Sequence, residues 1–303
     1  MTAEPQNDIP STPLSLPELL EKKALGEKIV MVTAYDAPSA RLADQAGIDI
    51  VFVGDSAANN MLGYTGTTPI SMDEMIMLAR AARRGVRHAF FLVDMPLGSF
   101  QISDEESVRN AVRFVKEAGA DGVKLEGGGP SVGRARAIVA AGIPVMGHIG
   151  LTPQSATMLG GNKAQGRTAA KARQLYADAQ ALQSAGCFSI VLEAVPQRVA
   201  ARITESLRIP TIGIGAGPDC DGQVLVWHDL LGINEGPMPR FVKQYAHLAE
   251  EMRRALETYA AEVRSGAFPT SEHAYKIPAE ELALFESELD SGALVGDASG
   301  DWF

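Results

Sequence analysis

The chain has little cysteine, few aromatic residues and no excess of positive charge. Cys187 and Cys220 are the two cysteines and form no CxxC pair, so neither a disulfide framework nor a zinc cluster is expected. Lys and Arg number 27 against 37 Asp and Glu, a formal net charge of -10. That balance argues against nucleic-acid binding, which needs a positive field, but it allows a local basic pocket for an anion.

Long apolar runs are absent as well. No run approaches the roughly 18 apolar residues that a membrane span needs. The segment 1–13 has neither an apolar centre nor a basic start, so no secretory signal is predicted. We therefore expect a cytoplasmic protein that binds small molecules and contacts neither membranes nor nucleic acid.

One pattern recurs along the chain: a helical stretch ends at a glycine, and a short apolar run follows. The junctions are Ala46-Gly47, Arg84-Gly85, Ala118-Gly119, Ala141-Gly142 and Ala185-Gly186. Glycine in this place closes a helix in the left-handed conformation, and continuously apolar runs are typical of parallel strands covered on both faces. The predicted strands are 29–32, 48–53, 89–93, 122–125, 143–146, 188–192, 210–214 and 224–227.

Amphipathic helices separate these runs. Apolar residues share one face in 105–119, 169–186 and 196–207, and a last helix is predicted near 241–265. Eight strand–helix units are typical of a (β/α)₈ TIM barrel. An open doubly wound sheet would need fewer strands or a break into halves, and the sequence has no such break. We predict the α/β class and a TIM barrel.

The two ends of the chain differ from the repeating part. Residues 1–27 form an N-terminal segment whose short helix, near 14–26, could plug the bottom of the barrel. The catalytic barrel is expected over 28–266. A partly flexible C-terminal extension follows over 267–303, with an acidic and Gly/Ser-rich arm or tail at 280–303. Residues 274–303 could pack on a neighbouring subunit.

Carboxylates end four of the predicted strands. They are Asp55 (followed by Ser56), Asp94, Glu126 and Glu193. Each aspartate alone could be a helix cap or a turn former. Together, at the carboxyl end of a barrel, they would repel one another unless a cation neutralised them. Oxygen ligands favour Mg²⁺ or Mn²⁺, and the three acids from adjacent strands could reach one ion, which predicts a metal site of Asp55, Asp94 and Glu126.

Three further residues and one loop face the same mouth. Glu193, two strands further round, could act as a general base across the substrate. Lys124 could bind a substrate carboxylate, balance the acids or form a structural salt bridge. His148 could donate a hydrogen bond to substrate or metal-bound water, or be a packed core histidine. The glycines of 213–217 stand in the wrong order for a dinucleotide fingerprint and are expected to line the mouth.

Several motifs together resemble the ketopantoate hydroxymethyltransferase family. They are VGDS at 53–56, DMP at 94–96, VKLEGG at 123–128, GHIGLTPQS at 147–155, VLEAVP at 191–196 and GIGAG at 213–217. The resemblance runs from about residue 28 to about residue 273. The chain departs from the family in Ala57-Ala58-Asn59, where many members have Leu-Gly-Met, and at Thr68, where an apolar residue is usual. Both departures concern the loop after the second strand.

The resemblance implies a TIM barrel with one Mg²⁺ per subunit, held by Asp55, Asp94 and Glu126. It also implies an oxo-acid site that contains Ser56 and Lys124 together with those two aspartates. Glu193 would be the proton acceptor, with His148 as a possible addition. A homodecamer, built as a pentamer of dimers, is implied as the assembly.

The same resemblance implies the reaction. The enzyme would transfer a hydroxymethyl group from 5,10-methylenetetrahydrofolate to 3-methyl-2-oxobutanoate. The product, 2-dehydropantoate, serves pantothenate and coenzyme A biosynthesis. The chemistry would be of the aldol type, through an enolate that Mg²⁺ stabilises. No motif in the sequence reads as a folate site.

Three other interpretations compete with this one. The isocitrate lyase and phosphoenolpyruvate mutase group also binds Mg²⁺ and oxo acids, but its Lys-Lys-Cys-Gly-His segment is absent, since Lys22-Lys23 precede Ala-Leu-Gly. A glycosidase would use two carboxylates, yet sugar sites favour aromatic platforms and aromatics are only 6%. A barrel used purely for binding or assembly would have no reason to keep four converging carboxylates.

Overall fold

The computed structural model describes residues 12–161, 163–236 and 238–291, and it confirms the predicted TIM barrel. Eight parallel strands close in sequence order, and β8 pairs with β1. The strands are β1 (Ile29–Thr33), β2 (Ile50–Val53), β3 (Phe90–Asp94), β4 (Gly122–Glu126), β5 (Val145–Gly150), β6 (Ser189–Glu193), β7 (Thr211–Ile214) and β8 (Gly222–Leu225).

The last strand, predicted at 224–227, lies two residues earlier in the structure, at β8 (Gly222–Leu225). The strand begins at Gly222, where a side chain would collide with the carbonyl oxygen of Ile29 on β1. Gly222 and Gln223 lack the apolar, β-branched character that marks the other strands, so hydrophobicity alone placed the start too late. Trp227 instead begins a short helix.

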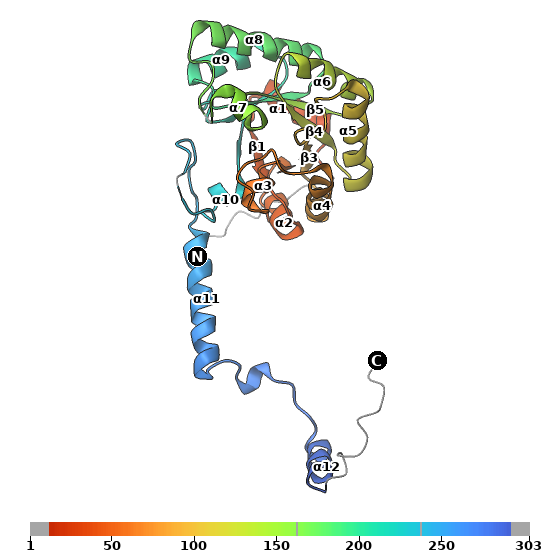
Figure 1. Cartoon of the computed structure of the whole chain (residues 1–303), viewed down its shortest axis with the longest axis vertical. Helices are drawn as coiled ribbons and strands as arrows, with labels where there is room; N and C mark the ends of the chain where they lie inside the picture. Colours follow the sequence, from red (N-terminus) through yellow and green to blue (C-terminus); the bar gives the residue numbers. More distant parts are fainter. Residues whose placement is uncertain (1–11, 162, 237, 292–303) are drawn as a thin grey trace. The chain divides into compact units, whose positions relative to one another are not determined.

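Helices surround the barrel (Figure 1). Those of the barrel unit are α1 (Leu16–Leu25), α2 (Ala37–Gln45), α3 (Ala57–Asn60), α4 (Met72–Arg83), α5 (Asp104–Ala118), α6 (Pro130–Ala140), η1 (Pro153–Ser155), α7 (Ala156–Leu159), α8 (Ala169–Ser184), α9 (Gln197–Ser206) and α10 (Trp227–Leu230). Local chemistry sets their ends. For example, Ser103 accepts a hydrogen bond from the Glu106 amide at the start of α5, and Gly119 closes the helix at a φ of 67°.

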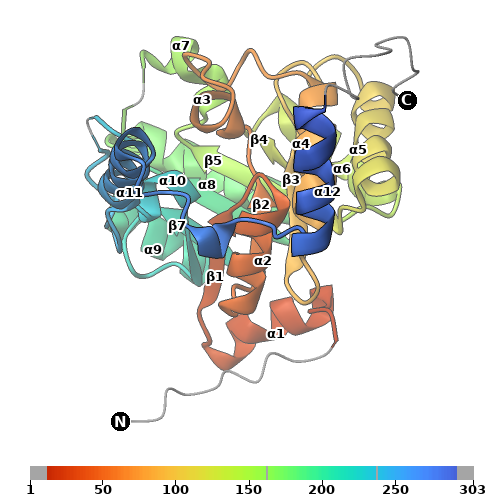
Figure 2. The same cartoon turned by 90° about the horizontal axis from the view of Figure 1, so that it is seen from below.

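Two hydrophobic clusters form the core. One lies between the strands and the outer helices. The other lies inside the barrel and includes Leu19 of α1, which is fully buried with Ile29, Phe90 and Phe188. The predicted N-terminal helix therefore closes the bottom of the barrel. Figure 2 shows α1 at one end of the strands and the α3 and α7 segments at the other.

The chain divides into two compact units, residues 1–248 and 249–303. The second unit contains almost all of α11 (Leu248–Ser265), then η2 (Ser271–His273) and α12 (Ala279–Asp290). The last predicted helix, 241–265, therefore starts seven residues late at 248, and part of the predicted tail is helical. The domain boundary at 266 stays a prediction. No helix within the described residues is long and apolar enough to cross a membrane.

Candidate active site

Seven side chains that the sequence singles out line one cavity at the carboxyl ends of the strands. It measures about 190 Å³ and also has apolar walls, among them Phe52 and Val191. The seven are Asp55, Ser56, Asp94, Lys124, Glu126, His148 and Glu193. We call this space the inner cavity. Strand register produces the convergence, since Asp94 pairs with Lys124 across β3 and β4, and Glu126 pairs with His148 across β4 and β5.

The charged groups form a connected chain. Lys124 Nζ lies 3.1 Å from Asp94 Oδ1 and 3.2 Å from His148 Nδ1. His148 Nδ1 lies 3.4 Å from Glu126 Oε1, and its Nε2 lies 3.1 Å from Glu193 Oε2. The contact with Glu193 is within ion-pair distance but is not aligned as a hydrogen bond. His148 is therefore the link between the acids of β3 and β4 and the carboxylate of β6.

Burial and crowding shift the acids of this chain. Burial, and then the charges of Asp94 and Glu126, raise the pKa of Asp55 well above its usual value. Burial also raises the pKa of Asp94, against the opposing charge of Lys124. Burial would raise the pKa of Glu126 too, but hydrogen bonds and the charge of His148 lower it overall. The site thus crowds four carboxyl groups, those of Asp55, Asp94, Glu126 and Glu193, around two basic side chains.

The two basic groups respond in the opposite sense. Burial opposes the charge of Lys124, yet Asp94, Glu126 and Asp55 outweigh burial and raise its pKa. Burial and Lys124 oppose protonation of His148, but the nearby carboxylates of Glu126 and Glu193 raise its pKa to about 9. Because its pKa is raised, the Lys124 ammonium inside the cavity is suited to bind an anionic substrate group.

Whether these residues fit a divalent ion can be tested on the structure. Across 12–161, 163–236 and 238–291, no three His, Cys, Asp or Glu side chains are arranged around one point as ligands of an ion would be. The donor set nevertheless fits, because three buried carboxylates meet here and Asp94 Oδ1 accepts no hydrogen bond. A cation would offset the burial and the repulsion from Asp94 and Glu126 that raise the pKa of Asp55. Asp55, Asp94 and Glu126 would hold it.

Two residues of the site were missed by the analysis of strand ends. Gln154 is buried and donates from Nε2 to Asp55 Oδ2 (2.9 Å), while its backbone amide donates to Glu126 Oε2 (3.0 Å). The hydroxyl groups of Tyr35 and Ser56 share a hydrogen bond, with 2.8 Å between Tyr35 Oη and Ser56 Oγ. Burial raises the pKa of Tyr35 to about 12. Gln154 lies in the GHIGLTPQS motif and Tyr35 follows the first apolar run, so both carried a usable signal.

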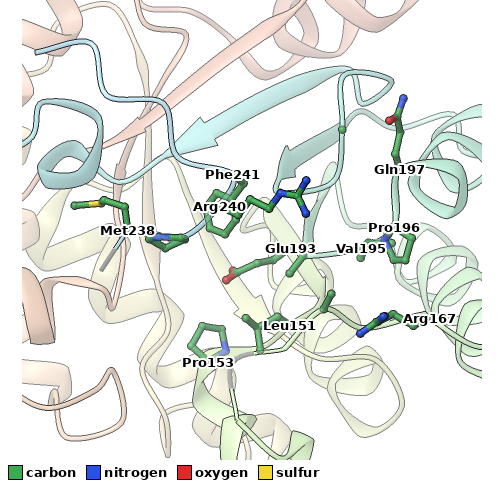
Figure 3. A pocket seen from close by; sticks show the side chains of 15 residues that line it. Leu151, Pro153, Arg167, Glu193, Val195, Pro196, Gln197, Met238, Arg240 and Phe241 are labelled. Carbon is green, nitrogen blue, oxygen red and sulfur yellow. The ribbon is translucent and has the colours of Figure 1, made fainter. Parts of the chain in front are cut away.

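Backbone geometry aims Glu193 into the mouth. The next residue, Ala194, has a φ of 49° and is the one described non-glycine residue with a positive φ. On the neighbouring strand a side chain at Gly150 would collide with the Glu193 carbonyl oxygen. These two positions let β5 and β6 end side by side while the Glu193 carboxylate turns inward (Figure 3).

A larger cavity of about 990 Å³ adjoins the inner one, and Glu193 lines both. Figure 3 shows Arg167 and Arg240 reaching into this space around Glu193, with Leu151, Pro153 and Phe241 beside it. We call it the arginine cavity. The glycines of the 213–217 loop line it as expected, and a side chain at Gly215 would come within 2.8 Å of the Phe241 ring.

Comparison with known proteins places these observations in context. The family model described as ketopantoate hydroxymethyltransferase matches residues 13–271. A 3-methyl-2-oxobutanoate hydroxymethyltransferase of Moorella thermoacetica is 56% identical over 263 residues, covering 87% of this chain and 98% of that protein. The protein of the same name from Thermotoga maritima is 53% identical over 258 residues, 85% of this chain and 95% of its own length.

Solved structures extend the likeness in fold. A phosphonopyruvate hydrolase complex with oxalate and Mg²⁺ has a TM-score of 0.55 and 14% identity, covering 94% of this chain and 99% of its own. A 2,3-dimethylmalate lyase of the phosphoenolpyruvate mutase/isocitrate lyase superfamily has a TM-score of 0.55 and 16% identity, over 94% and 100%. At this identity they share the barrel architecture alone.

Proposed function

The chain belongs to the ketopantoate hydroxymethyltransferase family, and on that premise we propose that it converts 3-methyl-2-oxobutanoate to 2-dehydropantoate with 5,10-methylenetetrahydrofolate as donor. The observation that carries the proposal is the inner cavity, where Glu193 faces Lys124 and three buried carboxylates across a space of about 190 Å³. That space suits a small branched oxo acid. Product formation would serve pantothenate biosynthesis in the cytoplasm.

Different residues of the inner cavity bind the substrate and the metal ion. Lys124 pairs with the substrate carboxylate, and Ser56, held by the Tyr35 hydroxyl, donates a hydrogen bond to the oxo acid. Asp55, Asp94 and Glu126 would hold one Mg²⁺ per subunit, and Gln154 hydrogen-bonds to the carboxylates of Asp55 and Glu126. When bound, Mg²⁺ would supply Lewis-acid stabilisation of the enolate.

Glu193 performs the proton transfer. Its carboxylate takes the proton from C3 of the substrate, and the C3 carbanion equivalent forms a carbon–carbon bond with the methylene carbon of the donor. Both methylene–nitrogen bonds of the donor break. One water supplies the oxygen of the new hydroxyl group, and the two protons of that water together with the proton held by Glu193 go to this oxygen and to the two nitrogens, so that tetrahydrofolate is released. His148, 3.1 Å from Glu193 Oε2, keeps the carboxylate turned toward the cavity.

The test is proton exchange without the donor. We expect wild-type protein with Mg²⁺ to exchange the C3 proton of 3-methyl-2-oxobutanoate into deuterated water, followed by proton NMR. Glu193→Gln should lose about 10²- to 10⁴-fold of that exchange, the range for general base catalysis, while binding of the oxo acid is kept. Glu205→Gln on α9, an exposed member of an ion pair with Arg202, is the matched control. Full exchange in Glu193→Gln would remove Glu193 as the base.

We also propose assembly as a homodecamer, a pentamer of dimers, which family membership supports. Sedimentation equilibrium on the full chain measures it. A species of ten subunit masses is expected, and a monomer or dimer at working concentration would contradict the proposal.

A further inference from the structure

The inner cavity cannot hold the one-carbon donor. A space of about 190 Å³ is far too small for a pteridine joined to a benzoyl-glutamate, so the donor must reach Glu193 from outside. Two outer cavities share lining with the inner one. The first is the arginine cavity, of about 990 Å³. The second, of about 610 Å³, lies over the α3 segment, and we call it the polar cavity.

The walls of the arginine cavity suit a flat, partly apolar body. Leu151, Val195 and Phe241 form apolar surface, with Pro153 and Pro196 adding rigid flat faces. Aromatic and proline walls bury a ring system at little cost in side-chain entropy. Glu193 stands at the edge that joins this cavity to the inner one, so a ligand lying in it would end beside the reacting carbon (Figure 3).

Charge separates the two outer cavities. Arg167 and Arg240 line the arginine cavity, both side chains are exposed, and neither forms an ion pair with another described residue. In a chain of net charge -10, two uncommitted guanidinium groups at one cavity attract an anion. The described lining of the polar cavity contains the acids Asp229 and Glu235 and no lysine or arginine.

We propose that the arginine cavity binds the p-aminobenzoyl-glutamate portion of the folate donor, with Arg167 and Arg240 pairing its carboxylates. The inference rests on the proposed function for the identity of the donor. The benzoyl ring lies against Phe241 and the proline faces, and the pteridine end reaches Glu193. Longer glutamate tails carry more carboxylates, so they bind more tightly at this end.

Kinetics of single and double variants test the assignment. In Arg167→Gln and Arg240→Gln we expect the KM for methylenetetrahydrofolate to rise about five- to tenfold each, the scale of a partly exposed charge-assisted bond. The rise should be larger for the triglutamate than for the monoglutamate, and smaller at high salt. The KM for the oxo acid and the donor-free C3 exchange rate should not move. Arg136→Gln, an exposed arginine on α6 that lines neither outer cavity, is the matched control.

Calorimetric binding of tetrahydrofolate triglutamate reads the site without turnover. Loss of binding in the double variant, at an unchanged melting temperature, supports the assignment of the arginine cavity. This holds even if the wild-type protein makes no product. Absence of product in the wild type would overturn the proposed function and leave the assignment of the cavity in place. Unchanged binding and KM in the double variant would overturn the inference while leaving the function standing. Asn59→Asp adds a negative charge to the polar cavity. If this variant raised the KM for methylenetetrahydrofolate while both arginine variants behaved as wild type, the glutamate tail would bind in the polar cavity instead.

Discussion

Aspartates stand at both ends of the barrel strands, but their surroundings are opposite. Near the amino ends of the strands, Asp44 in the last turn of α2 accepts hydrogen bonds from the amides of Arg87, His88 and Ala89, which precede β3, at 3.2, 2.9 and 2.7 Å. Asp121 likewise accepts from the Phe91 amide at 2.8 Å. Immediately after the strands, Asp55 and Asp94 are buried against each other and against Glu126.

The difference separates stability from function. Acids at the bottom find their partners within the folded chain. Backbone amides donate to Asp44 and Asp121, while Lys22 and Lys23 of α1 form ion pairs with Asp49 and Asp221. Acids at the mouth have too few partners within the chain and depend on what binds there. This agrees with the general division of the barrel, in which the carboxyl ends of the strands carry chemistry and the amino ends carry stability.

The largest effect should follow removal of one mouth charge. We expect Asp55→Asn to lower turnover by about 10³-fold, because a proposed ligand of Mg²⁺ and a negative charge that stabilises the Lys124 ammonium are lost together. The same change should raise the melting temperature of the metal-free protein. An acid whose pKa is raised by folding costs stability once pH exceeds its unfolded value of 3.8, so the gain should appear at neutral pH and vanish as pH falls below about 4.

Thermal melts with and without Mg²⁺ at pH 3.5 and pH 7.5 measure this prediction, together with steady-state turnover. Asp94→Asn is a poorer probe, because Asp94 also pairs with Lys124. A metal-free Asp55→Asn protein that melts below the wild type at pH 7.5 would contradict the comparison, since Asp55 would then be a structural acid like those at the bottom.

A bottom acid should respond in the opposite way. Asp44→Ala leaves three backbone amides without their acceptor, the Ala89 amide in a buried place and those of Arg87 and His88 in partly buried ones, so we expect a loss of about 3 kcal/mol in the free energy of unfolding. Turnover per folded molecule should stay unchanged. Urea unfolding and kcat on the same samples measure both. Asp44→Asn keeps one acceptor oxygen and should lose less; an equal loss would mean that charge, rather than the amide contacts, matters at this position.

The same contrast explains what could be predicted from the sequence. Continuous apolar runs and helix-closing glycines indicate the barrel, because the local preference of each for a buried strand or a helix end is also what the folded chain adopts. Acids after those runs indicate the mouth, because strand order brings them to one end. The start of β8 at Gly222 escaped prediction, since its signal is a close approach to β1 and not hydrophobicity.

Other features depended on contacts between distant residues. Gln154 contacts both Asp55 and Glu126 from η1, a single three-residue turn that is too short for hydrophobic periodicity to predict. Arg167 and Arg240 meet at one cavity although more than seventy residues of chain separate them, so no local pattern pairs them. Even Leu19, whose helix was predicted, needed the structure to show that it fills the barrel interior.

The smallest effect should come from the lysines under the barrel. Lys22 Nζ lies 3.0 Å from Asp49 Oδ1 and 3.7 Å from Glu27 Oε2, but its side chain keeps 23% of its exposure. We expect Lys22→Met to cost less than about 1 kcal/mol in urea unfolding, and less still at high salt. Asp49 would keep the hydrogen bond that its Oδ2 accepts from the Val30 amide at 2.8 Å. A loss above about 2 kcal/mol, undiminished by salt, would mean that the bottom acids depend on these lysines as strongly as the mouth acids depend on a bound cation. The two ends would then differ only in the source of the cation, which the chain itself supplies at the bottom.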